Sequence, residues 1–453
     1  MTTMSVRTVP ATVVLPGDDG WDEARQAWNA AVDQTPAAVA EPATVEDVIE
    51  AIHWARAYGM RVAPQSTGHN AAAMGDLSDT MLLKTSGLTE VSIDLERGVA
   101  RAGGGVLWEQ VVDAAAPLGM AVLHGSSPDV GVAGYSLGGG MGWLARLHGL
   151  ATNSLTAVEL VTMDGDFIRA DADNHPDLFW AVRGGGGNFG VVTALEFRMY
   201  PLESAYAGWL IFPWERSEEV LNASSEWTST APDEVTSVGR ILQLPDMEPI
   251  PPQLRGAKIV VVEAAFAGSE PDGAALMAPL RALGPIGDTF AQVPPQALAR
   301  LHQDPEGRTP GLGEHALLDA LTPETVRAFV ATAGPGSNET VLSAEIRHLG
   351  GALARPLPGN GALSHIDAAY MMFAIGIPAG PQVAAQLATD IARIVEALQP
   401  WSSGRSYLNF AQTPGSDTRT MFPEDAYRRL QEVKARYDAS GTARADHPIR
   451  MGA

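Results

Sequence analysis

The 453-residue chain carries 30 basic and 53 acidic residues, a formal net charge of −23, and 45% of its residues are hydrophobic. Such a chain is expected to form roughly two to three globular domains, and its negative charge disfavours nucleic acid and anionic membranes as partners. It contains no cysteine, which excludes disulfides, thiolate metal sites and thiol nucleophiles, so redox chemistry requires a cofactor. Because we find neither a basic and apolar leader nor an apolar run of about 18 residues, we expect a cytoplasmic protein with small-molecule partners.

Short helices and strands alternate through the first half of the chain. Residues 44–58 show apolar side chains at helical spacing behind a Thr44 cap, which predicts a helix. Strand patterns follow at 61–65, 81–85, 91–95 and 99–104, and helical spacing returns at 106–119. We predict an α+β fold, because no regular βαβ series is present.

Longer strand candidates dominate after residue 201, at 207–214, 236–244, 258–268 and 339–352. They predict one antiparallel sheet, and amphipathic helices are predicted at 383–398 and 423–438. We therefore expect residues 1–200 to form one domain and residues 201–410 to form a second, whose sheet is covered by helices. The segment 411–453 is expected to return to the first domain.

Three glycine-rich patches are the candidate ligand sites, because glycine lets backbone N–H groups converge on a phosphate. The first is the loop 65–70 with His69, although a plain turn has the same composition. The third spells G-x-G-x-x-G at Gly185, Gly187 and Gly190. A helical piece precedes it and a strand follows it, the reverse of a Rossmann motif, which argues against a nicotinamide dehydrogenase.

The second patch, residues 125–142, contains the G-x-S-x-G spelling of a serine-hydrolase nucleophile elbow at Ser136. Asp390 and His447 would complete the order Ser, Asp, His along the chain. Residues 131–134 make a poor buried strand, however, and the glycines after Leu137 weaken the helix that an elbow needs. A serine hydrolase is thus the alternative function.

Taken together, the patches resemble the berberine-bridge-enzyme-like oxidases, which belong to the vanillyl-alcohol-oxidase superfamily with its PCMH-type FAD-binding fold. The resemblance covers nearly the whole chain. Its main segments are STGHN (66–70), GSSPDVGVAGYSLGGGMGWLARLHG (125–149), HPDLFWAVRGGGGNFGVVTALEF (175–197) and YLNF (407–410).

The resemblance implies FAD as the cofactor, bonded covalently through His69. The cofactor contacts that it implies are Ser66, Thr67, Gly68, His69, Asn70, Ser126, Ser127, Val130, Gly131, Gly134, Tyr135, Gly139, Gly142, Val192 and Asn409. Turns of backbone N–H donors bind phosphate without lysine, which suits a chain with only three lysines, Lys84, Lys258 and Lys434. Many family members carry a second flavin link through cysteine at the position of Ser127, and since serine cannot form that thioether, we expect none here.

The implied reaction is hydride transfer from a small-molecule alcohol or amine to FAD, with molecular oxygen as the electron acceptor. The substrate is expected among secondary metabolites, sugars and alkaloid-like amines, and we expect no metal. Tyr407 and Asn409 are predicted to share one face of a strand at 407–410 and to face the flavin. A phenol with a pKa of about 10 would need a lowered pKa to act as the base.

A second group of catalytic candidates lies on the strand SAEIRHLGG. Alternation places Glu345 and Arg347 on one face and His348 on the other. Glu345 with Arg347 suits an amine substrate and His348 suits an alcohol or sugar, while a structural ion pair is the alternative. His365 and Tyr370 are weaker pocket candidates, and the oligomeric state stays open.

Overall fold

The computed structural model describes residues 8–451 except 249, 251, 338 and 339. Its first sheet has the strand order β1 (Val13–Val14), β2 (Ala38–Ala40), β4 (Thr80–Lys84) and β3 (Arg61–Gln65), with parallel β2–β4 and β3–β4 pairs. Helix α2 (Val45–Ala57) joins β2 to β3, and a reciprocal capping box between Thr44 and Asp47 closes its first turn. The apolar face of α2 packs on this sheet, because Val48 and Ile52 share a buried cluster with Met81.

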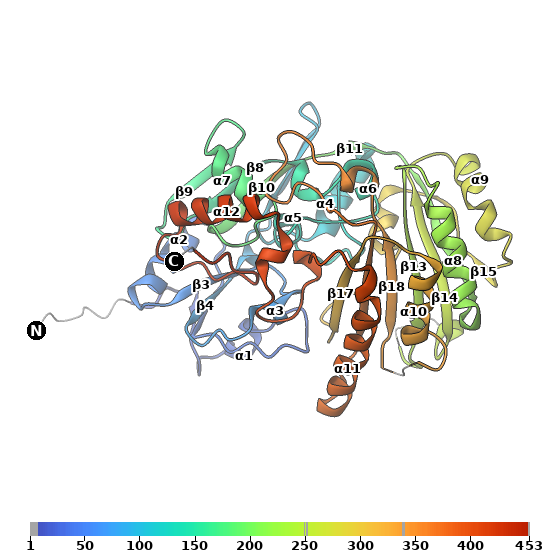
Figure 1. The fold of residues 1–453 in the computed structure, drawn as a ribbon. Coiled ribbons are helices and arrows are strands. Elements are labelled where there is room, and N and C mark those ends of the chain that lie inside the picture. The colour runs from blue at the N-terminus through green and yellow to red at the C-terminus, as the bar shows by residue number, and fades with distance from the viewer. Residues whose placement is uncertain (1–7, 249, 251, 338–339, 452–453) are drawn as a thin grey trace, which may run out of the picture.

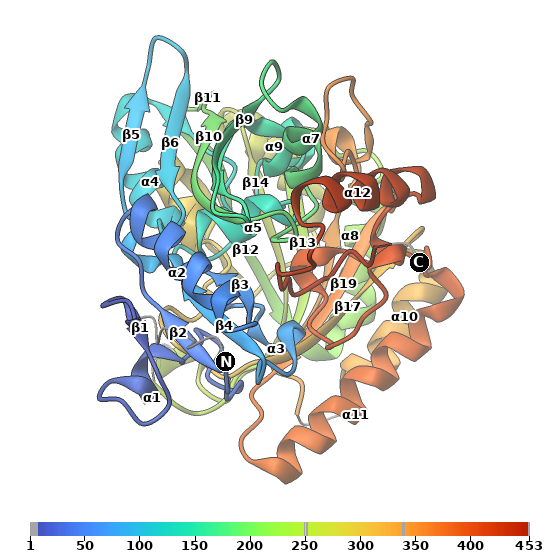
Figure 2. The same ribbon diagram turned by 90° about the vertical axis from the view of Figure 1, so that its left-hand side faces the viewer.

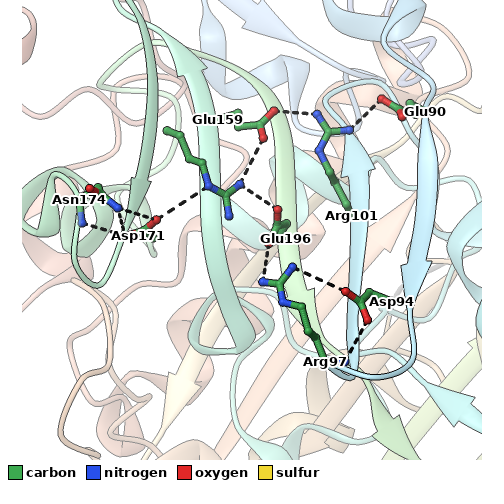
Figure 3. A network of polar contacts seen from close by, with 9 residues as sticks. Glu90, Asp94, Arg97, Arg101, Glu159, Asp171, Asn174 and Glu196 are labelled. Carbon is green, nitrogen blue, oxygen red and sulfur yellow. Dashed lines mark hydrogen bonds and ion pairs between the residues drawn. The ribbon is translucent and has the colours of Figure 1, made fainter.

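A second, antiparallel sheet of the first part has the order β5 (Val91–Asp94), β6 (Val99–Gly103), β10 (Val191–Arg198), β8 (Leu155–Val161) and β9 (Phe167–Asp171). Its apolar side packs with α4 (Trp108–Ala115), α5 (Val132–Leu137) and α7 (Pro176–Val182). The sheet also carries a cross-strand ladder of opposite charges, in which Arg169 Nη1 donates to Glu159 at 3.2 Å and to Glu196 at 2.8 Å (Figure 3). Side chains paired in this way stabilise neighbouring strands.

The second part of the chain is built on an eight-stranded antiparallel sheet. Seven strands follow the order β15 (Gly287–Asp288), β12 (Ala205–Pro213), β14 (Lys258–Phe266), β13 (Val235–Gln243), β18 (Ser343–His348), β19 (Tyr370–Gly376) and β17 (Leu312–Leu318), and β16 (Ala291–Val293) pairs with β12. One face is covered by helices (Figure 1), namely α8 (Ser217–Thr228), α9 (Glu270–Arg281), α10 (Pro323–Ala333) and α11 (Pro381–Leu398).

Alternation along the central strands of this sheet separates two environments. Ile241, Ala344 and Ile346 enter the apolar core beneath the helices, whereas Arg240 and Glu345, their neighbours in sequence, line a cavity on the other face. The inner face of the large sheet is therefore where charged side chains meet the first part of the chain.

The C-terminal tail lies against the first part of the chain. Helix α12 (Glu424–Tyr437) lies beside α7 (Figures 1 and 2). Beyond it, the Val62 N–H of β3 donates to the Thr442 carbonyl at 2.9 Å, and the Arg444 N–H donates to the Val62 carbonyl at 2.8 Å. The tail thus extends the free edge of the first sheet. The remaining short elements are α1 (Trp21–Ala24), α3 (Ala71–Met74), α6 (Ala145–His148), β7 (Met120–Ala121) and β11 (Tyr200–Pro201).

Except for the strand at 407–410, the predicted helices and strands are present close to their predicted positions, and residue 339, the first of the predicted strand 339–352, lies outside the described residues. The strand at 407–410 was a wrong prediction. The Tyr407 N–H donates to His315 Nε2 at 3.0 Å instead of to a strand partner, and a 3-10 turn, η9 (Leu408–Phe410), follows at once. The domain boundaries remain predictions. Among the described residues, none of the helices has the length and apolar character needed to cross a bilayer.

Candidate active site

A continuous cavity of about 1430 Å³ lies between the inner face of the large sheet and the loops of the first part. Thirteen of the predicted cofactor contacts line it: Ser66, Thr67, Gly68, His69, Asn70, Ser126, Ser127, Val130, Gly131, Gly134, Tyr135, Val192 and Asn409. Gly139 and Gly142 do not. A Cβ on Gly142 would lie 1.8 Å from the His124 carbonyl oxygen, and one on Gly139 would lie 2.9 Å from the Tyr407 hydroxyl, so both glycines permit close packing behind the wall.

The loop at 66–70 begins where β3 ends. Gly68 has a φ of +84°, and a Cβ there would lie 2.1 Å from Gln65 Nε2, so the turn requires glycine. Ser66 Oγ and Asn70 Oδ1 are buried with no hydrogen-bond partner within the described part of the chain. An unpaired buried polar atom costs roughly 1–3 kcal/mol, which indicates that a ligand with polar atoms pairs with this loop.

The second glycine patch lies directly against this loop. A Cβ on Gly131 would come within 2.5 Å of Ser66 Oγ, and one on Gly138 would come within 1.9 Å of Asn409 Oδ1. The two glycines therefore let three backbone segments converge on one space. This cradle, formed by residues 66–70, 130–138 and 409, fits a long ligand that bears phosphate groups.

His69 is held from three sides. The Trp28 ring stacks on the imidazole with ring centroids 3.9 Å apart, the Thr67 hydroxyl lies 2.7 Å from Nδ1, and Asp129 Oδ1 lies 3.7 Å from Nε2. Burial opposes ionisation of Asp129. Contact with His69 and hydrogen bonds from Trp28, Gly307 and Ser127 nevertheless hold its pKa well below the ordinary value.

Tyr407 and Asn409 are separated by the 3-10 turn. Asn409 lines the cavity, and its Nδ2 donates to the Tyr135 carbonyl at 3.0 Å. Tyr407 is only 1% exposed and is not among the lining residues. Burial raises its pKa above the ordinary value, and the Gly140 backbone and Arg347 offset this only in part. The lowered pKa that the predicted base role requires is therefore not found.

A buried cluster of charged residues lies on the side of the cavity that the large sheet forms. Arg347 Nε donates to Glu345 Oε1 at 2.6 Å, and His302 Nε2 lies 3.0 Å from Glu345 Oε2. His302 Nδ1 lies 2.6 Å from Glu263, whose other oxygen is 3.0 Å from Arg240 Nε. Burial opposes ionisation of Glu345, but the charges of Arg347 and His302 hold its pKa well below the ordinary value.

Sequence reasoning found Glu345 and Arg347 but missed Arg240, Glu263 and His302. Glu263 and Arg240 each stand within a buried, largely apolar strand. A charge in such a strand requires a buried partner. A charged residue within an apolar strand was therefore the sequence signal that could have identified Arg240 and Glu263. His302 lies in irregular backbone, where no periodic pattern marks it.

His348 does not line the cavity. Its Nε2 lies 3.0 Å from Arg146 Nη1, and its ring stacks on Tyr370 with centroids 5.6 Å apart. Burial and the Arg146 charge lower the pKa of His348 to about 3. Strand alternation turns His348 away from Glu345, as expected, and its position off the cavity wall does not support the predicted catalytic role. His365 and Tyr370, the weaker pocket candidates, also lie off the cavity wall.

The hydrolase alternative finds no support. Ser136 is 1% exposed inside α5 and does not line the cavity. Asp390 accepts from Thr340 at 2.6 Å, and His447 Nε2 lies 3.0 Å from the Leu408 carbonyl oxygen. The three residues do not form a triad, and the strand before the serine that an elbow requires is missing from the described residues.

The cradle and its fold define an FAD-binding protein. Residues 36–171 match the family model described as "FAD binding domain". Over 97% of both chains, the structure resembles 6-hydroxy-D-nicotine oxidase from Arthrobacter nicotinovorans at 25% identity and a TM-score of 0.84. Berberine bridge enzyme from Eschscholzia californica matches 98% of this chain and 97% of its own at 16% identity and a TM-score of 0.83. Residues 36–171 thus form an FAD-binding domain, the whole chain resembles the berberine-bridge-enzyme-like FAD-linked oxidases in fold, and the predicted fold class is confirmed.

Relatives differ in how much of the chain they share. (R)-6-hydroxynicotine oxidase of Paenarthrobacter nicotinovorans is 35% identical over 195 residues, which is 43% of this chain and 43% of that protein. Glucooligosaccharide oxidase from Acremonium strictum, a protein described as carrying a 6-S-cysteinyl, 8α-N1-histidyl FAD, matches this structure over 97% of both chains at 21% identity and a TM-score of 0.81. Sequence identity of 35% is thus confined to less than half of each chain, whereas the fold is shared over nearly all of it.

Proposed function

We propose that the chain is an oxidase that holds FAD covalently through His69 and oxidises a small, largely apolar amine, with molecular oxygen as the electron acceptor and hydrogen peroxide as the product. One observation carries this proposal: the same cavity is lined by the His69 cradle and by the inner face of the large sheet. Bound FAD would supply the acceptor for a hydride from the substrate carbon.

The cradle residues would hold the cofactor. Ser66 and Asn70 have buried polar atoms without partners among the described residues, and Gly131, which lacks a Cβ, leaves room beside Ser66. His69 lies in the same loop, at the place where the resemblance implies the covalent bond. The histidyl link named for glucooligosaccharide oxidase supports this attachment, while Ser127, which lacks a thiol, leaves one link only.

The wall opposite the cradle indicates the substrate class. Its apolar members are Trp209, Leu242, Leu244, Phe373, Ile377 and Phe410. The charged groups on the same wall already pair within their own cluster, so these apolar side chains favour a hydrophobic ligand over an oligosaccharide, whose many hydroxyl groups would need buried partners. The name of (R)-6-hydroxynicotine oxidase, a relative that acts on an amine, agrees with this choice.

The pKa values of the two base candidates favour an amine over an alcohol. A general base works best when its pKa is near the working pH. Tyr407 is shifted up and Glu345 is shifted down, so neither is suited to take a proton from an alcohol at neutral pH. A neutral amine can lose a hydride without an enzyme base. Since both Glu345 oxygens already contact cations, the amine would bind as the uncharged free base.

The test is direct. Purified protein should be yellow, and it should keep its flavin after acid precipitation. The His69→Ala variant should release its flavin on denaturation. A peroxide-coupled panel of hydrophobic amines, alcohols and oligosaccharides should give turnover with amines first. A colourless protein whose Ser136 reacts with a fluorophosphonate would reverse the assignment, and flavin found on a peptide without His69 would refute the attachment.

A further inference from the structure

Asp129 connects the first glycine patch to the second. Its Oδ1 lies 3.7 Å from His69 Nε2, and the carboxylate is 15% exposed. Three donors fix it in place: Ser127 Oγ at 2.8 Å, Trp28 Nε1 at 2.7 Å and the Gly307 N–H at 2.7 Å. A carboxylate held by three neutral donors keeps its negative charge and its position.

The two nitrogens of His69 meet different partners. Nε2 lies 3.7 Å from the Asp129 carboxylate, an ion-pair distance, and has no hydrogen-bond partner among the described residues, while Nδ1 lies 2.7 Å from the Thr67 hydroxyl, which is able to donate. This arrangement favours the tautomer with the proton on Nε2 and a lone pair on Nδ1. A carboxylate beside the distal nitrogen also stabilises the positive charge that a ring acquires when its other nitrogen forms a bond.

We propose that Asp129 is the positioning residue for covalent flavin attachment, because it holds His69 with Nδ1 as the nucleophile. The inference rests on the proposed link through His69. The Nδ1 lone pair forms a bond to the 8α-methyl carbon of the flavin, and the Thr67 hydroxyl turns aside. One hydrogen is lost from that carbon and one from the imidazole, and the two electrons released pass through the flavin to molecular oxygen. The products are the histidyl flavin and one hydrogen peroxide.

Two further features of the site support the assignment. Trp28 stacks on the imidazole with an interplanar angle of 17° and also donates to Asp129, so one side chain fixes both partners. Ser127, at the position where the resemblance implies cysteine in family members with a second link, donates its hydroxyl to the Asp129 carboxylate. In this chain the position serves the histidine link.

Asp129→Asn tests the role, because it removes the charge and keeps the size of the side chain. Covalent flavin, measured as fluorescence retained by acid-precipitated protein during incubation with added FAD, should form at least about tenfold more slowly than in wild type, while total bound flavin stays unchanged. Asp171→Asn is the matched control: the Asp171 side chain is 20% exposed, accepts from the Asn174 N–H at 2.8 Å and lies off the cavity wall, so attachment should keep the wild-type rate.

An Asp129→Asn protein that attaches flavin at the wild-type rate overturns the inference. Should this variant bind no flavin at all, Asp129→Glu decides, because it keeps the charge but displaces it by one methylene. A rate at least about threefold slower than wild type then supports the role, and an unchanged rate overturns it. If wild type itself binds FAD only reversibly, the proposed covalent attachment fails, and the inference fails with it for that separate reason.

Discussion

His302 Nε2 lies 3.0 Å from Glu345 Oε2, with the two side chains 3% and 2% exposed. The other ring nitrogen contacts Glu263, so one imidazole joins two carboxylates from different strands. Each carboxylate also meets an arginine, Arg240 or Arg347. Each charged group of the cluster therefore has its partner within the cluster. A buried charge that lost one partner would be left uncompensated.

His302→Gln is expected to lower the free energy of unfolding by about 3 kcal/mol at neutral pH, the order of loss for a broken buried pair. Burial and Arg240 lower the pKa of His302, but Glu263, Asp304 and Glu345 outweigh them and raise it to about 9. Because the unfolded value is about 6.5, the stabilisation is complete below that pH and is lost as the pH rises towards about 9. Urea unfolding across this range measures it.

The control for this prediction is His53→Gln, at an exposed position of α2. Wild type and the control should lose stability together as the pH rises, and His302→Gln should lose less. If the free energy of unfolding changed with pH by the same amount in all three proteins, His302 would not titrate in this range.

His348→Phe is expected to leave the rate of flavin reduction within about twofold of wild type, because His348 lies off the cavity wall. Phenylalanine keeps the stacking on Tyr370, and loss of the contact with Arg146 costs about 1 kcal/mol. Arg146→Met should instead lower the melting temperature markedly, since Arg146 donates to the Val235 and Leu349 carbonyls. Slow reduction in a His348→Phe protein of normal stability would restore the catalytic role.

Local patterns predicted most of this fold. The Thr44 cap and the apolar spacing of α2 are written in adjacent residues, and the long apolar strands of the large sheet follow from their period. The segment 407–410 has the composition of a strand, but its backbone donor meets a histidine from β17. Such a partner is set by tertiary structure.

The candidate site likewise has a part that local sequence patterns predict and a part that depends on tertiary structure. The cradle was predicted because its glycines and His69 lie in short, recognisable segments. The cluster was found only in part, because Arg240, Glu263 and His302 are brought to Glu345 by sheet pairing and by an irregular segment. The partners that shift a pKa therefore come from distant positions, and the sequence identified the base candidates without their protonation states.

Glu196→Gln is expected to lower the free energy of unfolding by about 1 kcal/mol. Glu196 is 11% exposed and pairs with Arg97 at 3.2 Å and with Arg169 at 2.8 Å (Figure 3). The arginines lower its pKa, so its contribution is present above the unfolded pKa of about 4.3 and is lost as the pH falls. Glu90→Gln, at a 75% exposed side chain with Arg101 as its ion-pair partner, should change stability by less than about 0.5 kcal/mol.

The final prediction concerns the proton of the substrate. Loss of a general base commonly slows a reaction by about 10²-fold or more. Since Tyr407 and Glu345 have pKa values shifted in opposite directions away from neutrality, we expect Tyr407→Phe and Glu345→Gln each to slow flavin reduction by an amine less than about tenfold.

The pH dependence of anaerobic flavin reduction separates substrate titration from enzyme titration. For an amine that binds as the free base, the second-order rate constant of reduction should rise with pH and level off at the pKa of the substrate itself. Two substrates whose ammonium pKa values differ by about two units should therefore level off about two units apart. Stopped-flow reduction of wild type with each substrate measures this. If both profiles level off at one common pH, a group of the enzyme takes the proton, and the variant that removes the common inflection, Tyr407→Phe or Glu345→Gln, identifies that group.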